Sequence, residues 1–299
     1  MTLNVTGMSP ITLDSTTLAI SDLAFTPDIV SIPFRHSGNE FPSIGAKPGA
    51  RPAFRYRTPW LAAYAYFGLK LKISSIVNIY FANFTAGLRT PTTASNTALQ
   101  VNNGCTGCSY IDGFSIDQFG LVMADVVTLM LSKDGITHPF QQVAAQVLPV
   151  LGSQPALSTM GPYQLNAVRK DGARSLGFRQ NAIVYSPIND GDSYPRLADW
   201  MGASPQFMID HEDALQMVTD LTLMGLNIAT NAVIWLADLD PTTFLRKTTG
   251  TSLTVTAGNV MVKSVPWNLN SASKASVVVE SLSSTGVHPV TVATGAALP

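Results

Sequence analysis

The segment Gly38-Asn39-Glu40-Phe41-Pro42 returns later in the chain as Gly191-Asp192-Ser193-Tyr194-Pro195, at an offset of 153 residues. The segment from Gly49 to Phe54 returns at the same offset as Gly202 to Phe207. Six of the 17 aligned positions from 38 to 54 are identical, where composition alone would give about one. Because glycine tolerates positive φ and proline fixes φ, the shared glycines and prolines predict the same turn in both places.

A second repeated block lies further along each copy. Residues 124–135 match residues 275–286 at an offset of 151, and His138-Pro139 matches His288-Pro289 at an offset of 150. Leu148-Pro149 matches Leu298-Pro299 in the same way. The sequence therefore predicts a tandem duplication, with a first domain over 1–149, a linker over 150–161 and a second domain over 162–299.

Each copy is expected to contain one helix. In the first copy Thr58 is a good N-cap, Pro59 suits the first helical position and Gly68 ends the periodic segment. In the second copy Asp210 is the expected N-cap and Gly225 the expected end. The two predicted helices occupy equivalent places in the repeat.

Strands are expected to follow each helix. The apolar segment 77–81 parallels 232–236 and is typical of a largely buried strand, whereas 69–73 alternates with lysines. Segments 126–131, 252–256 and 276–282 are rich in Val and Thr. The predicted fold class is mostly β, a sandwich or barrel with one flanking α-helix per domain. A loop of about 85–111, rich in Thr, Asn and Gly, is predicted as an insertion in the first copy.

The composition favours a protein that hides its surface by association. Hydrophobic residues make up 46% of the chain and charged residues only 12%, about half the roughly 25% usual in soluble domains. With 18 Lys and Arg against 19 Asp and Glu, no basic patch is visible, so tight nucleic-acid binding is not expected. No uninterrupted apolar run approaches the ~20 residues of a membrane span, and the N-terminus does not resemble a secretory signal. We therefore expect no membrane anchor.

The only two cysteines form Cys105-Thr106-Gly107-Cys108. A structural zinc site needs four ligands, and His36 and His138 are too scattered in sequence to complete one. The neighbours Asn102, Asn103 and Gly104 indicate a loop, not the start of a redox helix. A plain loop or a local disulfide is the preferred interpretation, and metal or redox chemistry the alternative.

Other candidate chemistry has simpler structural interpretations. The stretch 211–213, His-Glu-Asp, is expected to cap the second helix. His138 and His288 recur before proline without a recurring acid or nucleophile, which indicates a structural role. Asp190-Gly191-Asp192 and Asp238-Leu239-Asp240 lack the rest of a calcium loop, and solvated turns are expected there. The sequence thus predicts a protein that is not an enzyme, with no catalytic, cofactor-binding or metal residues.

A resemblance to a known family rests on organisation over nearly the whole chain. In the second copy Val184-Tyr185, Asp190-Gly191-Asp192 and Tyr194-Pro195 precede the predicted helix and Val/Thr-rich closing strands. This order resembles the tail tube proteins of long-tailed bacteriophages that carry two tube domains per chain. The resemblance implies a trimeric ring with pseudo-sixfold symmetry, stacked into a conduit in which DNA is only transient cargo. It also implies a virion protein made in the host bacterial cytoplasm, with itself and other phage tail proteins as partners. In that family the loop 85–111 would be an outward decoration.

Three alternatives remain open at this stage. A double jelly-roll capsid protein is also duplicated, but it needs about eight strands per copy, and five or six are evident. A receptor- or carbohydrate-binding tail module would need exposed aromatic side chains, for which Tyr110 and Phe114 are candidates. A hydrolase on a β scaffold lacks a recognisable constellation of catalytic residues.

Overall fold

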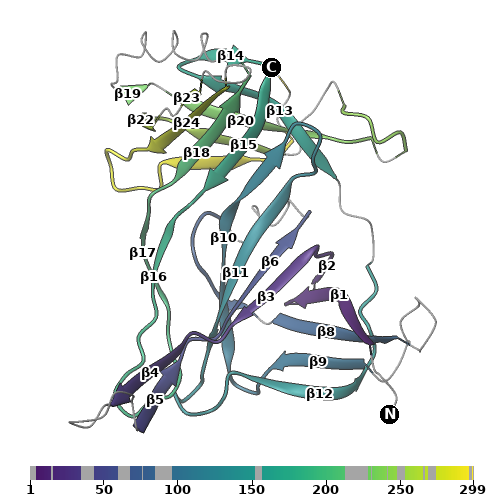
Figure 1. Ribbon diagram of the computed structural model, residues 1–299, viewed down its shortest axis with the longest axis vertical. Coiled ribbons are helices and arrows are strands. Elements are labelled where there is room, and N and C mark those ends of the chain that lie inside the picture. The colour runs from purple at the N-terminus through teal and green to yellow at the C-terminus, as the bar shows by residue number, and fades with distance from the viewer. Residues whose placement is uncertain are drawn as a thin grey trace.

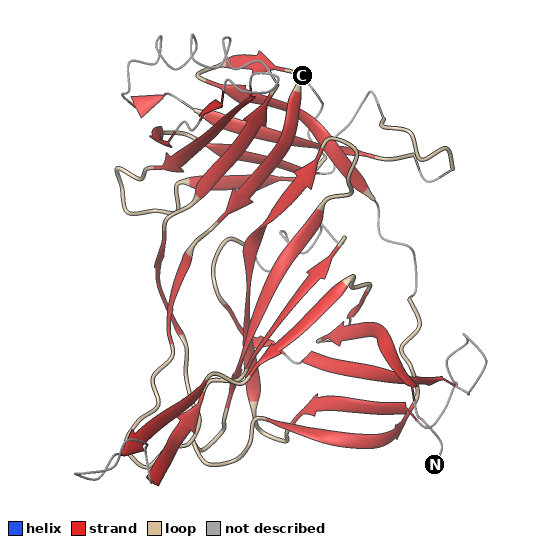
Figure 2. Cartoon of the chain, viewed as in Figure 1, coloured by secondary structure: helices blue, strands red, loops and turns tan. Residues whose placement is uncertain are grey.

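The computed structural model describes residues 5–14, 16–34, 44–59, 68–75, 77–84, 96–151, 157–212, 228–229, 231–240, 242–247, 253–264, 267–268, 274–295 and 298. Within these ranges the chain forms strands and turns, and no helix (Figure 2). All pairings between the strands are antiparallel. The expectation of a mostly β fold is confirmed.

Two five-stranded sheets, one from each half of the chain, lie at opposite ends of the molecule (Figure 1). The first contains, in spatial order, β12 (Phe140–Gln146), β9 (Asn96–Val101), β8 (Val77–Phe84), β1 (Val5–Leu13) and β2 (Thr16–Leu18). The other contains β25 (Val290–Ala293), β21 (Leu253–Ala257), β20 (Ala232–Asp238), β13 (Ser158–Leu165) and β14 (Val168–Lys170).

An 11-stranded sheet joins the two halves. First-half strands along it are β3 (Asp22–Thr26), β6 (Ala53–Thr58), β11 (Met123–Leu131) and β10 (Thr106–Asp117), with β7 (Lys72–Ser75) also paired to β10. Second-half strands are β15 (Ala173–Arg179), β18 (Gln206–His211), β24 (Lys274–Ser281), β22 (Val260–Ser264) and β19 (Ile228–Ala229), with β23 (Trp267–Asn268) also paired to β24. Each half adds a hairpin, β4 (Ile29–Phe34) with β5 (Ile44–Ala50), and β16 (Ala182–Tyr185) with β17 (Asp199–Ala203).

The strands of the two halves follow the same pairing scheme. Strands β1 to β9 correspond in order to β13 to β21, β10 corresponds to β22 together with β23, and β11 and β12 correspond to β24 and β25. With this correspondence the two five-stranded sheets have the same strand order, and so do the two parts of the long sheet.

The pairing registers of the two halves are related by the offsets found in the sequence. Phe54 pairs with Thr128 in the first half, and Phe207 pairs with Val279 in the second, which are the same positions after adding 153 and 151. The backbone N–H of Met130 donates to Pro52 O at 2.9 Å, and that of Ser281 donates to Pro205 O at 2.8 Å. The repeated X-Pro step thus ends one strand and begins the next in the same way in both halves.

One face of the long sheet supplies the hydrophobic core. In β6 the side chains of Phe54, Tyr56 and Thr58 are buried, whereas Arg55 on the alternate face is exposed, as the two-residue period of a strand requires. The five-stranded sheets contribute the facing side chains, including Ile79 and Ile234, to one continuous cluster. Each fully buried large apolar side chain stabilises the fold by roughly 1.5–3 kcal/mol relative to its exposed state.

The predicted helix start at Asp210 is wrong. Asp210 and His211 both lie in β18 and pair with Ser276 and Ala275 of β24, so their backbones belong to a sheet. In the first half Thr58 is the last residue of β6 and pairs with Ala124. The other residues of the two predicted helices, 60–67 and 213–225, lie outside the described residues, as does the repeated segment 38–42.

The predicted inserted loop is also wrong from residue 96 onward. Residues 96–101 form β9 and residues 106–117 form β10, and both strands have counterparts in the second half. The polar composition concealed the alternation in β9, where Asn96 and Ala98 are buried and Asn96 Nδ2 donates to Gln146 O at 3.2 Å. The predicted linker 150–161 is too long, because β13 begins at Ser158.

Candidate self-assembly edges

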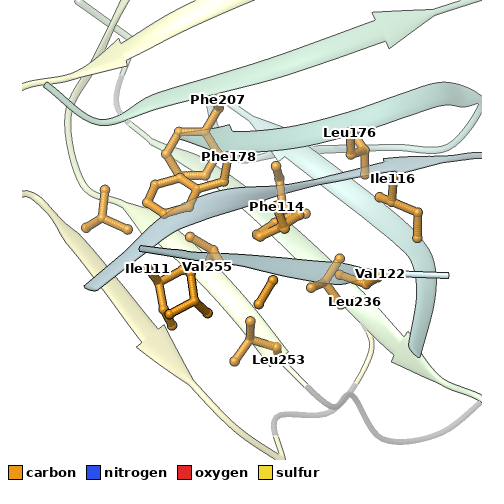
Figure 3. Close-up of a cluster of buried hydrophobic side chains, with 14 of the residues drawn as sticks. Ile111, Phe114, Ile116, Val122, Leu176, Phe178, Phe207, Leu236, Leu253 and Val255 are labelled. Carbon is orange, nitrogen blue, oxygen red and sulfur yellow. The ribbon is translucent and has the colours of Figure 1, made fainter. Parts of the chain in front are cut away.

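The two halves are joined edge to edge by β10 and β15. Residues 113–117 of β10 pair in order with residues 179–175 of β15. Phe114 and Ile116 thereby lie among Leu176, Phe178 and Phe207 of the second half (Figure 3). The ring centroids of Phe114 and Phe178 are 6.0 Å apart, and those of Phe178 and Phe207 are 5.4 Å apart. The end of β10 therefore completes the core of the second half.

A second contact between the halves involves the repeated motif itself. The loop 186–198, between β16 and β17, reaches the turn 132–138 of the first half (Figure 1). The N–H groups of Ser193 and Tyr194 donate to Gly135 O at 2.7 and 2.9 Å, and Ser132 N–H donates to Pro195 O at 2.8 Å. The Gly191-to-Pro195 motif thus acts as a docking segment that binds the other half through its backbone.

Side chains reinforce this docking. Asp192, with a side chain only 2% exposed, accepts a hydrogen bond from Arg196 at 2.6 Å, so it does not belong to a solvated turn as expected. In the receiving turn, the Thr137 hydroxyl and N–H and the Ile136 N–H donate to Asp134 and hold the pKa of its carboxyl below the ordinary range. A turn fixed by these hydrogen bonds presents the Gly135 carbonyl to the motif.

His138 contacts both its own turn and the docked motif. Its ring lies 4.3 Å from that of Phe140 and 5.1 Å from that of Tyr194 in the docked motif. Its Nδ1 lies 2.7 Å from Phe140 O, and His288 Nδ1 lies 3.2 Å from Val290 O in the equivalent turn. Both histidines therefore fix the turn that enters the last strand of their half.

The edge equivalent to β15 in the first half is β3, which ends the long sheet within the described residues. Four of its five residues are exposed, and Leu23 is half-buried. Phe25 packs on Phe54 with ring centroids 5.1 Å apart, as Phe178 packs on Phe207, but the Phe25 side chain remains 44% exposed. An exposed edge strand with a large apolar residue is a site for pairing with another strand.

The face of the long sheet opposite the core carries charges of both signs. Arg57 Nε donates to Asp125 at 2.9 Å, and Arg55 and Asp112 are 3.8 Å apart. Partial burial raises the pKa of Asp125, and the adjacent Arg57 opposes this shift. Such exposed pairs add only ~0–1 kcal/mol each to stability.

The two cysteines form no disulfide, and only Cys105 lies in a loop, the connection between β9 and β10. Both are free and buried, and Cys108 lies within β10, packed with Leu131 and Ala198. Burial, with a smaller contribution from Asp199, raises the pKa of Cys108 to about 12. A thiol with that pKa is a poor nucleophile and metal ligand at neutral pH, so Cys108 behaves as a small core residue.

The histidine and acidic residues that were candidates for a site also lie apart from one another. His211 is buried in β18 with Nε2 3.1 Å from Asp171 O, and Glu212 forms an ion pair with Arg174 at 2.8 Å. Asp213 lies outside the described residues. Asp240 accepts N–H groups of Thr242 and Thr243 in an exposed turn, which lowers the pKa of its carboxyl. Across the described ranges no group of three or more His, Cys, Asp or Glu is arranged to hold a metal.

The aromatic candidates for ligand binding are buried. Tyr110 is 8% exposed and Phe114 is 1% exposed, so neither is available on a loop for a carbohydrate. No helix in the described part of the chain is long and apolar enough to cross a membrane.

The sequence contained a signal for the two edges that was missed. Leu23-Ala24-Phe25 recurs as Leu176-Gly177-Phe178, at the same offset of 153 as the motif. No protein-family model matches the chain, and a search of curated proteins finds no similar sequence.

Proposed function

We propose that the chain is a tandem duplication whose function is to assemble with copies of itself as a structural protein. The observation that carries this proposal is the pair of equivalent edges. One edge, β15, is paired with β10 of the other half, whereas β3 ends the sheet with Phe25 exposed. A contact of this kind joins unlike surfaces, so it can be repeated from one chain to the next.

Repetition of a head-to-tail contact closes into a ring when the rotation allows it. Three chains would place six similar halves around one axis and give a homotrimer with pseudo-sixfold symmetry. A closed ring of sheets also removes the exposed edge, which is a liability in an isolated chain. We propose that such rings stack into the tail tube of a long-tailed bacteriophage, with other tail proteins as further partners and the virion as the location.

A conduit for DNA is supported by the charges on the face of the long sheet opposite the core. Its Arg57 is paired with Asp125, its Arg55 with Asp112, and its Lys263 lies 3.5 Å from Glu280. Cations paired in this way contribute little phosphate binding, which depends on neutralising the backbone and releasing counterions. DNA would pass such a wall without being retained.

The test combines mass measurement in solution with negative-stain microscopy of the purified chain. The expected result is a trimer mass and stacked rings or tubes with a central channel. A monodisperse monomer at high concentration, without rings or tubes under any salt condition, contradicts the proposal.

The same images separate the tube from the capsid alternative. The number of strands does not exclude a double jelly roll, because each half contains more than the eight strands that a jelly roll needs. The observation that favours a tube is the long sheet that continues from one half into the other through β10 and β15, since repetition of that pairing generates a barrel wall. Closed shells would identify a capsid protein instead.

A further inference from the structure

The strands β3 and β15 differ in what covers them and not in their apolar residues. Leu23 and Phe25 are the equivalents of Leu176 and Phe178, which are 1% and 0% exposed. In the second half, β10 covers these side chains with Phe114 and Ile116. In the first half Phe25 contacts Phe54 and Phe140 and is still 44% exposed.

The second half contains the equivalent of the covering strand. Phe114 and Ser115 of β10 pair with Ala124 and Met123 of β11. Trp267 and Asn268 of β23 pair in the same way with Ala275 and Lys274 of β24. The offsets are again 153 for the first strand of each pair and 151 for the second, so β23 stands where the end of β10 stands.

We infer that β23 of one copy pairs with β3 of a second copy in the register of the β10–β15 junction, with Trp267 opposite Phe25 and Asn268 opposite Ala24. This register follows by subtraction, because Phe114 pairs with Phe178 and Ser115 with Gly177 within the chain. The inference rests on the proposed self-assembly and specifies its contact. The partner is a second copy of this chain, bound by addition of a strand to a sheet edge.

The inferred register sets one aromatic residue, Trp267, opposite another, Phe25, as the internal register sets Phe114 opposite Phe178. Cross-strand aromatic pairs stabilise antiparallel pairing beyond the area they bury. The sequence departs from the internal junction at Pro266, which stands at the position of Gly113. Because proline has no N–H to donate, the backbone hydrogen bonds inferred between β23 and β3 begin at Trp267.

Disulfide trapping of the full-length chain tests this register. Ala24→Cys with Asn268→Cys places two cysteines opposite each other across the contact, and in a ring of three chains oxidation should give covalent dimers and trimers. Ser115→Cys with Gly177→Cys is the same pair within one chain and calibrates the yield. The native thiols compete little, since both are buried.

The control is Asp22→Cys with Asn268→Cys, a register shifted by two residues. Diagonal positions lie too far apart for an unstrained disulfide, so its yield should be at least about tenfold lower. Assembled wild-type protein together with no intermolecular trapping, or with equal trapping of both pairs, overturns the register and leaves the proposed function intact. A wild-type chain that stays monomeric at high concentration overturns both.

A second variant tests the contact without cysteines. Phe25→Lys keeps an apolar stem against Phe54 and places a charge at the edge of β3. The far-ultraviolet circular dichroism of the monomer should be unchanged, and the concentration needed for assembly should rise at least about tenfold. Assembly at the wild-type concentration by a folded Phe25→Lys chain contradicts the inference.

Discussion

Phe178 and Phe25 occupy equivalent positions in two strands of similar sequence, but Phe178 is completely buried and Phe25 is 44% exposed. The neighbours on the core side correspond as well, because Phe207 packs on Phe178 as Phe54 packs on Phe25. The difference comes from β10, which pairs with β15 but has no equivalent beside β3 within the described part of the chain. The exposure of Phe25 therefore reflects a missing neighbour and not a polar position.

The turns that lead into the last strand of each half show the same contrast. Gly135 is buried where the motif of the second half docks, whereas its equivalent Gly286 is exposed. Both glycines have positive φ, +80° and +73°, so the turn keeps its conformation with or without a docked motif. We expect two turns with the same conformation to bind the same kind of docking segment.

The largest effect should come from truncation of the covered aromatic residue. Phe178→Ala removes a fully buried ring that contacts Phe114 and Phe207, and we expect it to lower the free energy of unfolding by about 3–5 kcal/mol. Phe25→Ala should cost less than half as much in the monomer, because its ring is already partly hydrated. Urea unfolding of both variants measures the difference. Equal losses would remove the contrast between the two edges.

Gly113→Ala should disturb the junction itself. An added Cβ would lie 1.9 Å from Phe178 O, so the strands β10 and β15 would have to separate locally. We expect a loss of about 1–3 kcal/mol and faster proteolysis between the halves. Gly258→Ala is the matched control, because nothing lies within 4 Å of its added Cβ. A thermal midpoint for Gly113→Ala within a degree of the control would contradict the close approach.

The sequence predicted the β class because it depends on local residues, whereas the predicted repetition of the turn 191–195 at 38–42 lies outside the described residues. Gly135, Gly286 and the X-Pro steps at Pro52 and Pro205 fix backbone geometry wherever they stand. The strands β9 and β10 were missed because Asn96 and the cysteines suggested a polar loop. Their place in the sheet depends on partners far along the chain, such as Gln146 for Asn96.

The candidate edges were harder to predict from the sequence than β9 and β10, because an edge is defined entirely by long-range pairing. Nothing local distinguishes Leu23-Ala24-Phe25 from Leu176-Gly177-Phe178, and only the strand order shows that one is covered and the other is not. The expected acidic turn at Asp192 failed for the same reason, since its partner surface, the turn at Gly135, is 57 residues away in sequence. The periodicity of a sequence predicts that a segment is a strand, but the topology of the sheet determines which strand lies beside it.

Cys108 and Met261 are equivalent positions at the start of β10 and β22, and Cys108 is fully buried whereas Met261 is 38% exposed. We expect Cys108→Ser to cost about 1–2 kcal/mol, because it buries a hydroxyl among apolar neighbours. Met261→Ser should stay within about 0.5 kcal/mol of wild type. Urea unfolding of both variants measures the difference, and equal losses would contradict the buried environment of Cys108.

The reactivity of the Cys108 thiol gives an independent measure of its burial. With the pKa of Cys108 raised to about 12, its thiolate fraction at pH 8 is about a thousandfold below that of an ordinary thiol. A thiol reagent should therefore label Cys108 only after unfolding. Rapid labelling of the native chain at Cys108, located by mass spectrometry, would contradict the buried environment.

The smallest effect should be a pH dependence from His288 in the second-half turn. Partial burial lowers the pKa of this imidazole, and the positive charge of Lys70 lowers it further. The folded chain then binds fewer protons than the unfolded chain, so the His288 contribution is complete above the ordinary pKa of about 6.5 and declines as the pH falls below it. Urea midpoints measured at pH 7.5 and 5.5 should fall less on acidification in His288→Asn than in wild type. Lys70→Gln should also reduce the fall, because removal of the nearby charge lets the imidazole bind a proton more easily in the folded chain. An unchanged difference between the two pH values in both variants would show that His288 does not govern this dependence.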